Sequence, residues 1–190
     1  MRVIPTTQWH STPANTAGLG RQRALGILIH HTAGPNLKIR MAGTGEMERA
    51  CALAREVQRQ HQRQNRWIDI GYHFIVSRGG IILEGRTGSL DAAQRGLVVR
   101  GAHAGNNEAN ARWWGVVLEG SYMEVFPLED QWVAAVDLCA HLSLWGTTQA
   151  QEIRGHRDFK ATECPGQQMY DALERFREEV RDRKLQLKED

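Results

Sequence analysis

Histidine and cysteine occur together near the C-terminal end of the sequence. The stretch RGHRDFKATECPG, residues 154–166, places His156 and Cys164 eight positions apart in a polar segment, with a Pro-Gly pair directly after the thiol. Three roles suit these residue types: a structural corner, a cysteine nucleophile with a histidine base, or two ligands of a zinc ion. A hydrolytic zinc site needs a third protein ligand, so other histidines have to be considered.

The apolar stretch ILIHHT, residues 27–32, offers that third ligand. A short apolar run with β-branched residues predicts a buried strand. Adjacent side chains in a strand point to opposite faces, so one of His30 and His31 can face the site while the other packs elsewhere. Periodicity alone does not choose between them.

The other two cysteines have a simpler interpretation. Cys51 and Cys139 fall on the apolar stripes of two predicted helices, where a thiol behaves as a small hydrophobic group. Three cysteines without framework spacing do not indicate a disulfide scaffold. We therefore expect Cys51 and Cys139 in the core and Cys164 at the site.

Length and composition limit the class of protein. The chain has 190 residues, 41% hydrophobic and 24% charged, with a formal net charge of +2. These values suit one soluble domain and give no basis for a nucleic-acid partner. The apolar run LGILI is too short to span a membrane, and residues 1–20 lack the apolar core of a signal peptide. We expect a chain made in the cytoplasm, without membrane insertion, that needs another route to act outside.

The pattern of the chain predicts strands and helices in alternation. Residues 1–23 read as an extended N-terminal arm, and residues 33–45 and 100–113 as loops, by their Gly, Pro and Asn content. Strands are predicted at 24–32, 71–77, 80–86 and 114–120, the middle two as a hairpin. Helices are predicted at 46–64, from about 128, and after Gly166, with a charged tail over about 181–190 that we expect to fray. This order predicts one α/β domain, residues 1–190, with a central mixed sheet flanked by helices.

Five motifs in order resemble the type 2 N-acetylmuramoyl-L-alanine amidases, a superfamily that includes phage endolysins and animal peptidoglycan-recognition proteins. They are ILIHHTAG, DIGYHFIVSRGGIILEGR, GAHAGNN, WGVVLEGSY and RGHRDFKATECPG, and the resemblance runs from about residue 3 to 175. It implies the peptidoglycan-recognition-protein-like amidase fold. It also implies zinc-dependent hydrolysis of the amide between N-acetylmuramic acid and L-alanine in peptidoglycan.

The resemblance also assigns residues. It implies one Zn²⁺ held by His30, His156 and Cys164, and a catalytic role for Tyr72. Thr162 matches a position that is lysine in the phage enzymes and threonine in catalytic recognition proteins, so we expect it to take part in catalysis. Recognition proteins that have lost catalysis typically lack the cysteine, so Cys164 favours an active enzyme.

Further positions match the family less specifically. His103, Asn106 and Arg86 are candidates for substrate contact. The catalytic glutamate of the cytoplasmic recycling amidases aligns with Val117, and we expect nearby Glu119 to be a hydrogen-bonded or rim carboxylate. The general base is therefore not assigned.

The resemblance implies a monomeric enzyme that binds peptidoglycan. A phage or prophage endolysin, or a bacterial lytic enzyme, fits best, acting on the cell wall after release from the cytoplasm. The alternative is a peptidoglycan-binding recognition module with weak or no catalysis. Retention of the three ligands and Tyr72 favours the enzyme.

Overall fold

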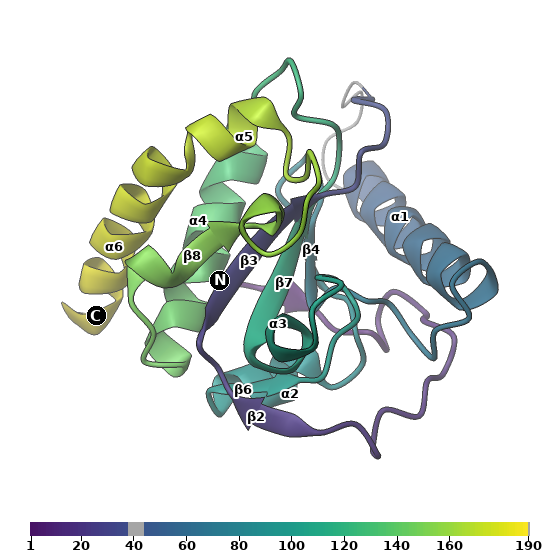
Figure 1. The fold of residues 1–190 in the computed structure, drawn as a ribbon. Coiled ribbons are helices and arrows are strands. Elements are labelled where there is room, and N and C mark those ends of the chain that lie inside the picture. Colours follow the sequence, from purple (N-terminus) through teal and green to yellow (C-terminus); the bar gives the residue numbers. More distant parts are fainter. Residues whose placement is uncertain (38–43, 190) are drawn as a thin grey trace.

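A six-stranded mixed sheet forms the centre of the fold in a computed structural model of the chain, which describes residues 1–37 and 44–189 (Figure 1). In spatial order the strands are β1 (Val3–Ile4), β5 (Ile82–Glu84), β4 (Phe74–Val76), β7 (Trp113–Leu118), β3 (Gly26–His31) and β8 (Ile153–Gly155). The β4–β5 hairpin is antiparallel, and the other neighbouring pairs are parallel. The carboxyl ends of β4, β7, β3 and β8 therefore meet at one edge.

Helices cover both faces of this sheet (Figure 1). α1 (Thr44–Arg63) lies over one face, where its small apolar residues share a buried cluster with Ile75, Leu83 and Val117. α4 (Glu129–Trp145) and α6 (Leu173–Glu189) lie over the other face. With both faces covered, all residues of β3 and β7 are buried, as their near-continuous apolar sequences require.

Shorter elements complete the fold. β2 (Arg21–Arg23) and β6 (Leu97–Val99) form a separate antiparallel pair. The remaining elements are α2 (Ser89–Gln94), α3 (Asn107–Arg112), η1 (Ala150–Glu152), η2 (His156–Asp158) and α5 (Gln167–Asp171). None of the helices in the described ranges has the length and apolar character to cross a membrane.

The predicted fold class is confirmed: the molecule is an α/β domain whose mixed sheet is flanked by helices, and the predicted hairpin is β4–β5. Cys51 and Cys139 are buried, as predicted.

Helix α3 differs from the prediction, because it lies within the predicted loop 100–113. Its N-cap is Asn106, whose side chain accepts a hydrogen bond from the backbone N–H of Ala109. The predicted loop 33–45 lies partly outside the described residues.

The two ends of the chain are more tightly packed than predicted. In the predicted N-terminal arm Ile4 and Trp9 are buried, and the indole of Trp9 donates to the carbonyl oxygen of Glu84 at 2.8 Å. The tail predicted to fray is helical through Glu189. Arg183 donates to Asp137 on α4, and Lys184 donates to the carbonyl oxygen of Thr148. These contacts dock the charged helix in place, which composition alone does not reveal.

Candidate metal centre and active site

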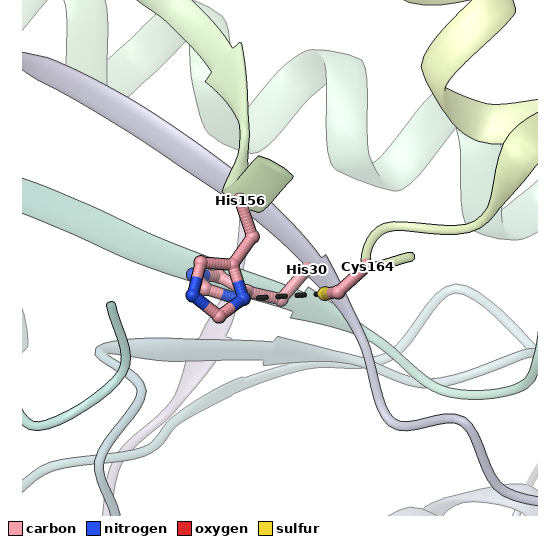
Figure 2. A group of neighbouring side chains, drawn as sticks. All are labelled: His30, His156 and Cys164. Atoms are coloured by element: carbon pink, nitrogen blue, oxygen red, sulfur yellow. Dashed lines mark hydrogen bonds between the residues drawn. The ribbon is translucent and has the colours of Figure 1, made fainter. Parts of the chain in front are cut away.

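Three predicted ligands converge at the carboxyl edge of the sheet (Figure 2). His30 lies near the end of β3, His156 begins η2 directly after β8, and Cys164 precedes α5. Their ligand atoms all lie within 4.8 Å of one another, and Sγ of Cys164 is 3.7 Å from Nδ1 of His30. Two imidazole nitrogens and a sulfur are a donor set that zinc accepts, with room for a fourth ligand. The residues present therefore fit a zinc ion.

Strand alternation separates His30 from its neighbour. His30 points toward the α1 face, whereas the ring of His31 lies on the opposite face and its Nδ1 accepts from the backbone N–H of Tyr122 at 3.3 Å. The backbone N–H of His31 donates to Sγ of Cys164 at 3.4 Å. His31 thus contributes its main chain to the cluster, and His30 contributes its side chain.

Both imidazoles of the cluster have a second partner. Nε2 of His30 is 2.9 Å from Nδ1 of His103, and Nε2 of His103 is 3.1 Å from the carbonyl oxygen of Trp113. Nε2 of His156 is 3.2 Å from the carbonyl oxygen of Ala104. Each ring therefore has its Nε2 engaged by a partner outside the three-residue cluster.

The protonation states suit metal binding better than a cysteine nucleophile. Burial lowers the pKa of His30 well below its ordinary value, and burial also lowers the pKa of His156, so both rings are neutral at neutral pH. Burial raises the pKa of Cys164 to about 11. A neutral histidine could take the thiol proton, but burial disfavours both the thiolate and the imidazolium that this transfer would form, and neutral imidazoles supply no charge that would hold a thiolate. A metal cation at the cluster would.

The two predicted catalytic side chains border the cluster. The ring centroid of Tyr72 lies 5.1 Å from that of His30, and burial, followed by the nearby Cys164, raises the pKa of the Tyr72 phenol. Tyr72 is therefore a protonated donor at neutral pH. The hydroxyl oxygen of Thr162 accepts from the backbone N–H of Cys164 at 3.3 Å, which leaves the Thr162 proton free to donate.

The three candidates for substrate contact all make hydrogen bonds within the protein, and their contact with substrate stays a prediction. His103 is buried behind His30, and Arg86 is buried with its guanidinium donating to the carbonyl oxygens of Ile70 and Arg100. Asn106 caps α3. Strand and helix packing turns all three side chains toward groups of the protein itself.

Glu119 is a hydrogen-bonded carboxylate, as predicted, and it is buried. It is 5% exposed, it pairs with Arg49 on α1, and it accepts from the backbone N–H of Arg78 at 2.8 Å. Arg49 also pairs with Glu46, at 2.7 Å. The hydrogen bonds of the Glu119 carboxylate are therefore directed at α1 and the β4–β5 hairpin.

Sequence reasoning did not find the groups that hold the histidines. The carbonyl oxygens of Ala104 and Trp113 belong to backbone, which carries no residue-type signal. The side chain of Asn110, which accepts from the backbone N–H groups of both His103 and Ala104, lies in a segment predicted to be loop. Only the histidine in GAHAGNN gave a signal, and that signal predicted contact with substrate, not the hydrogen bond to His30.

Comparison with known proteins identifies the family. A family model described as N-acetylmuramoyl-L-alanine amidase matches residues 20–167. The chain belongs to the type 2 N-acetylmuramoyl-L-alanine amidase family. The matched range contains His30, His156 and Cys164, and it also contains Tyr72 and Thr162.

The family relatives include both amidases and recognition proteins. The chain is 26% identical over 173 residues to peptidoglycan recognition protein 1 of Mus musculus, covering 90% of this chain and 86% of that protein. It is 30% identical over 174 residues to the N-acetylmuramoyl-L-alanine amidase of Homo sapiens, covering 90% of this chain and 27% of the human protein.

Solved structures of the same family share the fold. Drosophila PGRP-LB is 27% identical to this chain, with a TM-score of 0.73 and coverage of 90% of this chain and 92% of that one. A variant of PGRP-LB in complex with tracheal cytotoxin matches with the same TM-score and coverage at 26% identity.

Proposed function

We propose that this protein is a zinc-dependent hydrolase of the amide bond between N-acetylmuramic acid and L-alanine in peptidoglycan. One observation carries the proposal: in a chain of the amidase family, two neutral imidazoles and a thiol have their ligand atoms within 4.8 Å of one another. Burial on its own keeps that thiol protonated. A divalent cation would explain why two neutral imidazoles and a thiol lie together, because metal binding requires neutral histidines and favours the thiolate.

His30, His156 and Cys164 would hold the ion, which gives the three protein ligands that hydrolytic zinc sites use. A bound zinc ion would supply a Lewis acid for the scissile carbonyl and would lower the pKa of a bound water to about 7. Tyr72 donates a hydrogen bond from its protonated phenol to the oxyanion that develops on the carbonyl oxygen. Thr162 supplies a second donor at the rim.

Peptidoglycan is the proposed substrate. The complex of the PGRP-LB variant with tracheal cytotoxin supports this choice, because tracheal cytotoxin is described as monomeric diaminopimelic acid-type peptidoglycan. The monomeric state, the endolysin role and action on the cell wall after release from the cytoplasm stay predictions.

Digestion of purified peptidoglycan tests the proposal. The products of an amidase are stem peptides with a new L-alanine amino terminus and glycan strands without peptide. Mass spectrometry of the soluble fraction detects the peptides. If the protein sediments with peptidoglycan and releases no peptide, it is a recognition module and the proposed hydrolase activity is wrong.

A further inference from the structure

The hydrogen bonds behind His30 determine where its proton lies. A carbonyl oxygen only accepts, so the contact between Nε2 of His103 and the carbonyl oxygen of Trp113 places the His103 proton on Nε2. Nδ1 of His103 is then an acceptor, and the 2.9 Å contact requires His30 to donate from Nε2. Nδ1 of His30 then carries the lone pair and lies 3.7 Å from Sγ of Cys164.

His156 is held in the same way by the next residue. Its Nε2 is 3.2 Å from the carbonyl oxygen of Ala104, so this nitrogen carries the proton and Nδ1 keeps its lone pair. Two consecutive residues, His103 and Ala104, thus engage both histidine ligands, one through a side chain and one through the main chain.

This dipeptide is itself fixed by a single side chain. Oδ1 of Asn110, on α3, accepts from the backbone N–H of His103 at 2.8 Å and from that of Ala104 at 2.9 Å. The His103 ring also needs two glycines. A Cβ atom at Gly115 would lie 2.7 Å from Cγ of His103, and one at Gly101 would lie 2.8 Å from Cδ2.

We infer that the His103–Ala104 dipeptide, held by Asn110, selects the tautomer and direction of both histidine ligands, so that His103 and Asn110 are positioning residues of the metal centre. The inference rests on the proposed function, because it concerns metal binding. Outer partners of this kind fix the tautomer of a ligating histidine, and their loss typically weakens metal affinity by about 10- to 100-fold.

His73 provides a matched control. It is buried like His103, its Nε2 contacts a carbonyl oxygen, that of Val99, at 2.6 Å, and its Nδ1 accepts from the backbone N–H of Gly115 at 2.8 Å. The two rings are neighbours, with centroids 5.2 Å apart. Because both rings are buried and each contacts a backbone carbonyl oxygen, leucine at either position should have a similar cost in folding, whereas only His103 is hydrogen-bonded to a proposed ligand.

The test combines zinc affinity with the tautomers of the metal-free protein. Competition with a colorimetric chelator should show about 10- to 100-fold weaker zinc binding for His103→Leu and for Asn110→Ala. His103→Asn, whose side chain can accept from His30, should recover most of the affinity, and His73→Leu should keep it. Long-range ¹H–¹⁵N spectra of metal-free wild-type protein should show the proton on Nε2 of His30 and His156.

The possible failures are distinguishable. Wild-type zinc affinity in folded His103→Leu, or a proton on Nδ1 of His30 in the wild-type protein, would overturn the inference. If His103→Leu does not fold, the wild-type spectra and Asn110→Ala decide. If wild-type protein shows the expected tautomers and binds no zinc, the proposed metal centre is wrong and the tautomer assignment stands.

Discussion

The backbone N–H of His31 donates a hydrogen bond to Sγ of Cys164 at 3.4 Å, across 133 positions of sequence. This contact joins the loop that carries Cys164 to the end of β3, the strand that carries His30. It also places an N–H donor on the sulfur, which stabilises the thiolate form required of a ligand. A backbone group of β3 therefore helps to position Cys164 beside the two histidines.

Replacing Cys164 should weaken zinc binding, whereas replacing a cysteine in the core should not. Cys164→Ser keeps an acceptor for the N–H of His31 but removes the soft donor, so we expect a folded protein whose zinc affinity falls by more than about 100-fold, beyond the loss of an outer partner. Cys51→Ala, at a buried thiol on α1, should keep zinc binding. Chelator competition measures both. Equal zinc affinity in Cys164→Ser and wild type would exclude Cys164 as a ligand.

Tyr72→Phe should slow hydrolysis without loss of metal. The phenol is positioned to donate to the developing oxyanion, and loss of one such donor typically costs about 100- to 1,000-fold in kcat. Zinc affinity and sedimentation with peptidoglycan should match those of wild type. An unchanged kcat in this variant would remove Tyr72 from the mechanism.

A partly buried histidine outside the cluster, His61, should make stability depend on pH. Burial lowers the pKa of His61 to about 4, from an ordinary value near 6.5. The unfolded chain then binds more protons below pH 6.5, so His61 stabilises the folded state fully above that pH and loses this contribution as pH falls toward 4. On the order of 1–2 kcal/mol should be lost between pH 7 and pH 5.

The matched variant for this effect is His61→Asn, which can keep an acceptor for the backbone N–H of Gly71. Urea unfolding of metal-free protein at pH 7 and pH 5 should show a smaller pH effect in the variant than in wild type. The same pH effect in both proteins would show that His61 titrates normally in the folded state.

The N-terminal segment should contribute strongly to stability, in contrast to a free arm. Trp9 is fully buried and hydrogen-bonded to the carbonyl oxygen of Glu84, so Trp9→Ala should cost about 3–5 kcal/mol of unfolding free energy. Thr7→Ala, at an exposed position in the same segment, should cost little. Chemical denaturation compares the two, and equal stabilities would contradict the packing of this segment.

The ion pairs of Arg49 with Glu46 and Glu119 should stabilise the fold without affecting zinc binding. Arg49→Met leaves the carboxylates of Glu46 and Glu119 without their cation, and we expect a loss of about 3 kcal/mol. Adding Glu119→Gln should restore part of this stability because one unpaired charge is removed. Zinc affinity should stay unchanged in both variants. A selective loss of activity in Glu119→Gln, with stability retained, would instead give Glu119 a catalytic role.

Strong local signals explain what the sequence predicted correctly. The apolar runs around residues 27–31 and 113–118 are strands buried on both faces, and helices α1 and α4 carry apolar stripes. The metal cluster was predicted through the family motifs, since spacing left His30 and His31 equivalent. The choice between His30 and His31 depends on which face of the sheet each side chain points to. This is known only when the neighbouring strands are in place.

Long-range packing explains what the sequence did not reveal. Helix α3 and the partners of the histidines depend on backbone carbonyls and on Asn110, whose role exists only when α3 lies beside residues 103–104. The C-terminal helix is held by Arg183 and Lys184, which meet partners at Asp137 and Thr148. Such contacts between distant segments have no local pattern.

The most direct test of the central claim is peptidoglycan digestion before and after removal of metal. Free stem peptides with an L-alanine amino terminus should appear with the purified protein, disappear after treatment with a chelator, and return when zinc is added back. Cys164→Ser should give no peptides under any of these conditions. Peptide release that persists in the chelator, with no effect of added zinc, would contradict the zinc amidase and support a thiol nucleophile.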